Sequence, residues 1–294
     1  MIPVHYLPPG DQWDQTLVRL LLTNRLYPTP WEFAEATYGT EWPDADGLIL
    51  VFPGRYYTET PEQVYDALAR YDWVLVIKTG DEEDAFDLSP LANQPRRKLW
   101  SQTPCLTKNH PEGIRYMPLG FSPHFVDLPA SPPTKTTTVF LSAQNNHSRR
   151  REAFRVLDGQ DIGDMVVRPT PGFTQGMSPD DYQRHMISAR IAPAPSGVFS
   201  PDSFRVYEAL ESHTIPIADD VSPVYDSRGY WSAIFPDTPP FPVLSDYDSL
   251  VGWIGDLLLA HPDNANRTTA AWMREKRKWS LLLDSDLIDL GAEP

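Results

Sequence analysis

The sequence contains a single cysteine, Cys105, among its 294 residues. One cysteine can form neither an internal disulfide nor a cysteine-based zinc site, and no base stands near it in the sequence to activate it as a nucleophile. Runs of about 18 apolar residues are also missing, so the sequence predicts no membrane span. The first residues carry no basic segment followed by an apolar one, so we expect no signal peptide.

Positive charge is scarce as well. The chain has 25 lysines and arginines against 40 aspartates and glutamates, which gives a formal net charge of −15. An evenly spread negative field disfavours binding to nucleic acid and to acidic membranes. Basic residues nevertheless cluster, and each cluster is either a solvated helix face or an anion site; the clusters are Arg96–Lys98, Arg149–Arg151 with Arg155, and Arg274 with Lys276–Lys278.

Several common catalytic motifs are absent. The sequence has no His-Glu-x-x-His zinc motif, no calcium loop, no Gly-x-x-x-x-Gly-Lys phosphate loop and no Gly-x-Ser-x-Gly elbow. We therefore expect no bound metal and no cofactor. The 31 prolines occur together with many aromatic residues, which predicts rigid loops in a folded chain rather than disorder.

Apolar strands and amphipathic helices alternate along the chain, which is typical of Rossmann-like α/β domains. The expected strands are Val4–Leu7, Leu48–Phe52, Trp73–Lys78, Leu99–Ser101, Ile114–Met117, Thr138–Ser142, Met165–Arg168, Ala189–Ala194, Ile215–Ala218, Trp231–Phe235 and Phe241–Leu244. The expected helices are Trp13–Asn24, Pro61–Arg70, Ser148–Leu157, Pro179–Ser188, Pro201–Leu210, Tyr247–Leu259 and Ala265–Leu283, and 27–46 is expected to be irregular. The stretch 121–138 is rich in Pro, Ser and Thr, which predicts a linker between two domains.

The stretch 188–218 predicts a strand, a loop, a helix and a second strand. Ser200 suits an N-cap and Pro201 suits the first helical position. The start of such a helix favours a phosphate, because its N–H groups and the positive end of its dipole point outward. Ser203 and Arg205 would add a hydroxyl and a guanidinium in the first turn. Glu208 could accept sugar hydroxyls, although Arg205 and Glu208 could equally form an exposed ion pair.

The block Ser203-Phe204-Arg205…Glu208-Ala209-Leu210…Ile215-Pro216-Ile217 resembles the exostosin-type glycosyltransferases, in which such a block contacts the nucleotide sugar. The resemblance implies that Ser203, Phe204, Arg205 and Glu208 bind a nucleotide sugar, with Glu208 on the ribose. Retaining relatives carry two glutamates, of which Glu208 matches the second, whereas Ser200 stands where the first would be. The departure favours an inverting mechanism.

The resemblance further implies the GT-B fold, in which two Rossmann-like domains face each other across a cleft and a C-terminal helix crosses back. The expected domains are an acceptor domain at 1–126, a nucleotide-sugar-binding domain at 127–264, and a returning helix at 265–294. Arg150 and Arg151, in the basic helix of the second half, are expected to bind the donor diphosphate. No metal is expected, because arginines and helix N–H groups would stabilise the leaving group.

An inverting transfer needs a carboxylate that takes the proton of the acceptor hydroxyl. The loops after the strands of the first half supply the candidates Asp11, Asp81, Glu82 and Glu83, and the acidic run 81–84 could also be a solvated loop. The expected donor is a UDP-sugar. The expected acceptor is a saccharide or a hydroxymethylated pyrimidine in DNA, as in phage-type base glucosyltransferases.

Two other functions fit the same pattern. A nucleotide-sugar epimerase would use two such domains and release an altered donor without an acceptor. A non-catalytic module would bind the sugar nucleotide and transfer nothing. Because the animal exostosins are membrane-anchored and this chain shows no such anchor, we expect a cytoplasmic protein, in the host cytoplasm if the chain is viral, with no membrane partner.

Overall fold

A computed structural model describes residues 1–8, 13–54, 60–83, 86–104, 112–128, 134–172, 175–224 and 229–293. The chain divides into two compact units. Unit 1 contains Met1–Leu119 and Arg274–Pro294, and unit 2 contains Gly120–Met273. The last helix, α8 (Asp263–Leu290), is continuous across the division at Met273.

Unit 1 is built on a parallel sheet in the order β2-β1-β3-β4-β5-β6. Its strands are β1 (Val4–Tyr6), β2 (Thr37–Tyr38), β3 (Gly47–Pro53), β4 (Trp73–Thr79), β5 (Arg97–Ser101) and β6 (Ile114–Tyr116). β3 and β4 are buried at every position. Strands buried on both faces are expected to be continuously apolar, as β3 is throughout and β4 is until its last two residues, Lys78 and Thr79.

The helical segments of unit 1 are η1 (Trp13–Gln15), α1 (Thr16–Leu22), α2 (Pro61–Leu68), η3 (Ser89–Leu91) and the second half of α8. α2 begins with a reciprocal cap, in which Thr60 accepts from the Gln63 backbone and Gln63 accepts from that of Thr60. Asp286, in the part of α8 that belongs to unit 1, accepts hydrogen bonds from Trp100 and Arg115 and so holds the helix against the sheet.

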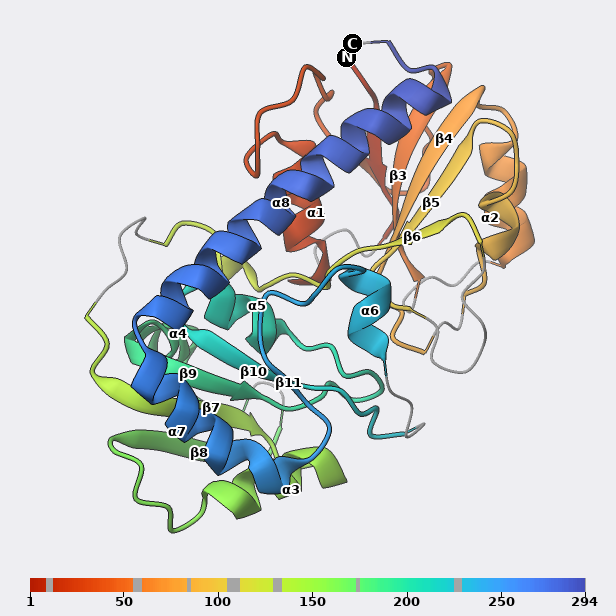
Figure 1. Ribbon diagram of the computed structural model, residues 1–294. Coiled ribbons are helices and arrows are strands. Elements are labelled where there is room, and N and C mark those ends of the chain that lie inside the picture. The colour runs from red at the N-terminus through yellow and green to blue at the C-terminus, as the bar shows by residue number, and fades with distance from the viewer. Residues whose placement is uncertain are drawn as a thin grey trace. The chain divides into compact units, whose positions relative to one another are not determined.

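Unit 2 is built on a second parallel sheet, in the order β11-β10-β9-β7-β8. Its strands are β7 (Thr137–Gln144), β8 (Met165–Thr170), β9 (Ala189–Ala194), β10 (Ile215–Asp219) and β11 (Val243–Leu244). Its helical segments are η4 (Pro123–Phe125), α3 (Ser148–Leu157), α4 (Pro179–Ser188), α5 (Phe204–Glu211), α6 (Tyr230–Ile234), η5 (Tyr247–Ser249), α7 (Leu250–Ala260) and the first part of α8. Figure 1 shows both sheets with their helices.

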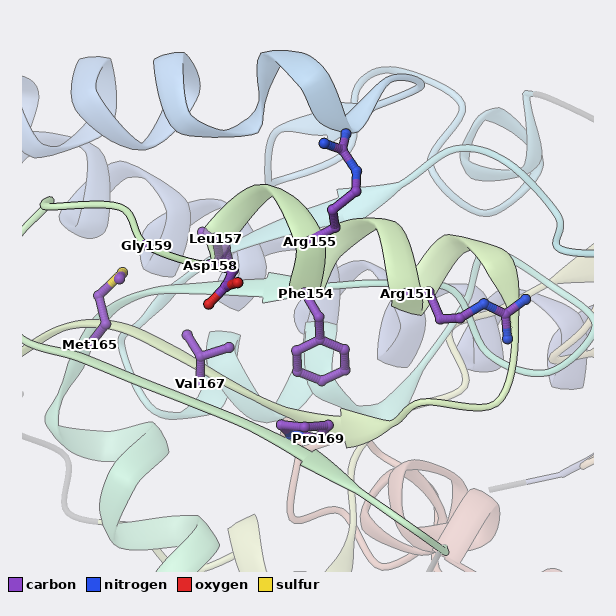
Figure 2. Close-up of a pocket in the computed structure, with 9 residues that line it drawn as sticks. All are labelled: Arg151, Phe154, Arg155, Leu157, Asp158, Gly159, Met165, Val167 and Pro169. Atoms are coloured by element: carbon purple, nitrogen blue, oxygen red, sulfur yellow. The ribbon is translucent and has the colours of Figure 1, made fainter.

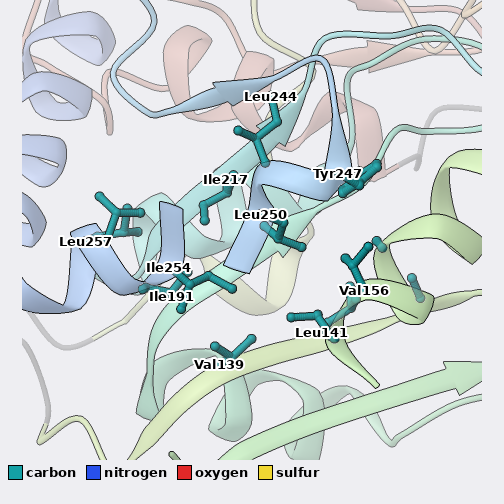
Figure 3. Close-up of a cluster of buried hydrophobic side chains, with 14 of the residues drawn as sticks. Val139, Leu141, Val156, Ile191, Ile217, Leu244, Tyr247, Leu250, Ile254 and Leu257 are labelled. Carbon is teal, nitrogen blue, oxygen red and sulfur yellow. The ribbon is translucent and has the colours of Figure 1, made fainter. Parts of the chain in front are cut away.

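One apolar core of unit 2 lies between its sheet and the helices α3 and α7 (Figure 3). Leu141, Ile191 and Ile217 come from three neighbouring strands, and Val156 and Ile254 come from the two helices. α4 and α5 contact the same strands and each other. Each unit is therefore an α/β unit with a parallel sheet, the coarse architecture that the sequence predicts.

The structure corrects two predicted elements. The helix expected from Pro201 begins at Phe204, and its N-cap is Ser203 rather than Ser200. The strand expected at Trp231–Phe235 is the helix α6, which begins after Gly229, a residue with a φ of 80°. A short edge strand, β2, also lies in the stretch 27–46 that the sequence predicts to be irregular. Among the described residues, no helix is long and apolar enough to cross a membrane.

Candidate functional site

The strand order of unit 2 creates a natural ligand site. From β7 the chain crosses to β8 on one side and then returns to β9 on the other side. At such a switch point the loops after the two strands diverge, and the crevice at the carboxyl ends is where open α/β sheets bind ligands. The loop after β7 (145–147) and the loop after β9 (195–203) meet this condition. We call this place the unit 2 edge.

Two arginines converge on the carboxyl end of β7. The Nε of Arg205 donates to the Ser142 carbonyl at 2.8 Å. Arg150 donates to the Gln144 and Asn146 side chains and, through Nε, to the Ser196 carbonyl at 3.0 Å. These acceptors are all neutral, and the charge of Arg205 also acts on the buried carboxylate of Glu208.

The first turn of α5 reaches the same edge. Ser203 is its N-cap, is 5% exposed, and does not use its side chain to cap the helix. Its buried Oγ has no hydrogen-bond partner among the described residues. A buried hydroxyl without a partner is uncommon and is often explained by a bound ligand or water. Phe204 is half-buried and opens the helix.

His147, the residue before α3, has two buried ring nitrogens that make no hydrogen bond of ordinary geometry within the described residues. Burial lowers the pKa of His147 to about 4, and the charge of Arg150 adds to this effect. The Ser196 carbonyl and Asp219 oppose it. The imidazole is therefore neutral at pH 7 and can donate one N–H to an anionic oxygen.

Asp219 connects α3 to the loop after β9 through hydrogen bonds. It ends β10, is fully buried, and accepts from Arg149, Ser196 and Tyr247 and from the backbone of Val221. From the sequence, neither Asp219 nor His147 is assigned to the candidate site. The available signal was the position of Asp219 at the end of a strand and of His147 in the short loop after one.

Arg151 lies elsewhere. Successive residues of an α-helix point in directions 100° apart, so Arg150 and Arg151 diverge. Arg151 lines a groove of about 510 Å³ between α3 and β8, together with Phe154 and Val167. Figure 2 shows Arg151 at one end of the row of lining residues. β8 is an edge strand of the sheet and neighbours β7. The structure thus brings Arg150 to the unit 2 edge and gives Arg151 a different surface.

Glu208 also differs from its expected setting. It is 4% exposed and accepts a hydrogen bond from the Tyr182 hydroxyl at 2.9 Å. Burial raises the pKa of Glu208, while hydrogen bonds from Ser122 and Tyr182 and the charge of Arg205 hold it down. Protein donors therefore already occupy part of the carboxylate that was expected to bind ribose.

Three of the carboxylates expected to act as a base, Asp81, Glu82 and Glu83, follow β4 in unit 1. Asp11 lies outside the described residues. Asp81 is buried, forms an ion pair with Lys78 at 3.2 Å, and accepts from the Phe86 backbone at 3.0 Å. These contacts fix it as part of the fold. Glu82 is half-buried and Glu83 is exposed.

The described residues contain no cluster of three or more His, Cys, Asp or Glu that could hold a metal ion. No protein-family model and no curated protein matches the chain. What the protein does is therefore inferred from the chemistry of its own side chains.

Proposed function

We propose that the protein is a glycosyltransferase whose unit 2 binds a nucleotide sugar. The observation that carries the proposal is the gathering of Arg150, Arg205 and the Ser203 hydroxyl, which has no partner among the described residues, at the switch point of a parallel sheet. Two guanidinium groups, a free hydroxyl and a helix N-terminus are the groups that recognise a diphosphate. The resemblance of the block 203–217 to the exostosin-type enzymes supports the same ligand.

In the proposed reaction, an acceptor hydroxyl attacks the anomeric carbon of the sugar from the side opposite the diphosphate. The bond from that carbon to the phosphate oxygen breaks, and the nucleoside diphosphate leaves with the electron pair. Arg150 and Arg205 stabilise the negative charge that develops on the leaving oxygen. The sugar is transferred with inversion, and the expected donor is a UDP-sugar.

Nucleotide binding is the direct test. UDP, GDP, ADP and dTDP are added separately to the protein and the melting temperature is measured, since a ligand that binds only the folded state stabilises it. We expect at least one diphosphate to raise the melting temperature. Arg205→Ala and Arg150→Ala should reduce this rise. A panel in which no diphosphate stabilises the protein would contradict the proposal.

Two variants of the same helix sharpen the result. Arg155→Ala is the matched control, because Arg155 is exposed and pairs with Glu152 and Asp248 away from β7. Arg151→Ala tests the sequence-based prediction for that residue, and its place in the α3–β8 groove leads us to expect unchanged binding. Equal losses in Arg150→Ala and Arg155→Ala would point to a general effect of charge rather than a site.

Turnover is then measured with the nucleotide sugar whose diphosphate binds, by the release of that diphosphate in the presence of oligosaccharides or hydroxymethylated DNA. Salt separates the two acceptor classes, because binding to DNA weakens steeply between low and moderate salt whereas binding to a neutral saccharide does not. Formation of an altered nucleotide sugar without any acceptor would instead identify an epimerase.

A further inference from the structure

Unit 1 has a switch point of its own. Its chain runs from β1 to the edge strand β2 and then crosses back to β3 on the other side of β1. Asp14, in the 3-10 helix η1 that follows β1, lies at the carboxyl ends of this sheet. Its carboxylate packs directly on Gly80, the first residue after β4. A Cβ on that glycine would stand 1.8 Å from Asp14 Oδ2, so no side chain other than hydrogen fits there.

The backbone of Asp14 is held in place as well. Gln102, which directly follows β5, donates through Nε2 to the Asp14 carbonyl at 2.6 Å and to the Leu119 carbonyl at 3.0 Å. Asp14 is only 7% exposed. Its position is thus set by the ends of two central strands rather than by a solvated loop.

The Asp14 carboxylate is buried but not fully used. Its Oδ1 has no hydrogen-bond partner among the described residues. The same holds for Nε2 of the neighbouring Gln15 and for the hydroxyl of Thr79, the last residue of β4. Buried polar atoms are nearly always paired in native proteins, so three atoms at one sheet end without partners among the described residues call for a bound polar ligand or water.

Thr79 and Asp14 belong to the same face of the sheet. Leu7 and Val76 pack in the core of the α2 face. Side chains alternate along a strand, so Tyr6 and Thr79 point to the opposite face. That face carries α1, because Arg19 of α1 stacks on the Tyr6 ring with 4.9 Å between Cζ and the ring centre. η1 leads directly into α1.

The environment also suits a group that exchanges protons near neutrality. The pKa of Asp14 is raised to about 6, mainly by burial and also by the charge of Glu82, against the lowering effect of hydrogen bonds from the Asp14 and Gln15 backbone. A base with a pKa near the working pH takes up a proton and releases it readily. Asp81, two residues from Thr79, is instead neutralised by Lys78.

We propose that Asp14 is the general base of the transfer and that Gln15 and Thr79 bind the hydroxylated acceptor beside it. The proposal rests on the proposed function. As the acceptor oxygen forms its bond to the anomeric carbon, its proton moves to Asp14 Oδ1 and the nucleoside diphosphate departs with the electrons of the broken bond. Asp14 later releases the proton to solvent.

The test uses Asp14→Asn, which keeps the shape of the side chain but removes the base, with Asp66→Asn on the exposed face of α2 as the matched control. The rate of diphosphate release from the nucleotide sugar identified in the binding panel is measured from pH 5 to 9. We expect the unaltered protein and Asp66→Asn to gain rate as the pH rises through about 6. Asp14→Asn should be at least about 100-fold slower and lose that dependence.

Binding is measured on the same samples. The affinity of Asp14→Asn for the nucleoside diphosphate should stay within about twofold of that of the unaltered protein. A general base lowers the activation free energy of the transfer and does not bind the leaving diphosphate. An Asp14→Asn rate within about threefold of the control would overturn the assignment of Asp14 alone. A protein that neither binds a diphosphate nor releases one from any nucleotide sugar would overturn the proposed function, and the role of Asp14 with it.

Discussion

Arg149 forms a bidentate ion pair with Asp219, with Nη2 at 2.6 Å from Oδ1 and Nε at 2.9 Å from Oδ2. The pair joins the first turn of α3 to the end of β10. Arg149 is immediately followed by Arg150, so the ion pair also fixes the direction from which Arg150 reaches the unit 2 edge. A structural pair thus positions the residue that we propose binds phosphate.

Removal of the Asp219 carboxylate should therefore destabilise unit 2 strongly. Asp219→Ala removes the carboxylate that accepts from the Arg149 guanidinium and the Tyr247 hydroxyl, while the Ser196 hydroxyl keeps the Val221 carbonyl as an acceptor. Breaking a buried pair of this kind costs about 3–5 kcal/mol. Urea denaturation measures the loss. Asp248→Ala is the control, because Asp248 pairs with the exposed Arg155 and should change stability little. Equal effects of the two variants would show that the Asp219 network carries no special weight.

The pH dependence of stability gives an independent view of Asp14. Burial raises its pKa from 3.8 to about 6 in the folded state, so the folded protein takes up a proton more readily than the unfolded chain. Stability is therefore lost as the pH rises from about 4 to about 6, and the cost persists above that range. A shift of this size corresponds to on the order of 3 kcal/mol.

Asp14→Asn removes the charge and with it this cost. We expect the variant to be more stable than the unaltered protein at pH 8 and about equally stable below pH 4, as measured by denaturant unfolding at both values. A base that lowers stability in its charged form is consistent with selection for chemistry rather than for folding. If Asp14→Asn were less stable at pH 8, the side chain would have a structural role instead.

His147 provides a spectroscopic test of the diphosphate site. Burial and Arg150 lower its pKa to about 4, so its ring should be neutral in the free protein at pH 6. A bound diphosphate places negative charge near the ring and should raise the pKa. Nitrogen and carbon NMR shifts of the imidazole, followed from pH 4 to 8 with and without the stabilising diphosphate, measure the change. An unchanged titration curve would place the phosphates away from His147.

The sequence predicts the two parallel sheets well, because buried strands such as Trp73–Thr79 are apolar at nearly every position. Helix boundaries that depend on loop geometry are less readable. Ser200 and Ser203 are both good N-caps, and only the fold decides that α5 begins after the second. The stretch 230–235 is short and aromatic, and such a pattern does not separate a strand from a helix.

Candidate site residues show the same limit. Arg150 and Arg151 are adjacent in the sequence. Only the orientation of α3 shows that Arg150 reaches the unit 2 edge and Arg151 the α3–β8 groove. From the sequence, the acidic run at 81–83 is a stronger candidate for the base than Asp14. The sequence does not reveal that Lys78, in the preceding strand, forms an ion pair with Asp81. Burial and pairing, which decide reactivity, arise from contacts that spacing alone does not reveal.

Glu208 can be tested for the ribose contact that the resemblance implies. Tyr182 and Ser122 already donate to its carboxylate, and it is nearly fully buried. We therefore expect Glu208 to hold α5 against α4 rather than to accept a hydrogen bond from the sugar. The contact with Tyr182 joins α4 to α5. Its loss should make the start of α5, where Ser203 and Arg205 lie, less well ordered.

Comparison of a ribonucleoside diphosphate with its 2′-deoxy analogue separates the two roles. If Glu208 binds the ribose, Glu208→Gln should reduce the preference for the ligand with the 2′-hydroxyl, because an amide oxygen accepts a weaker hydrogen bond than a carboxylate. If Glu208 positions α5, the variant should weaken both ligands by the same factor and lower the melting temperature. Tyr182→Phe serves as the matched control, since it removes the contact to Glu208 without touching the carboxylate. We expect both variants to keep the ratio of the two affinities measured by calorimetry, and a ratio that collapses only in Glu208→Gln would return Glu208 to the ribose.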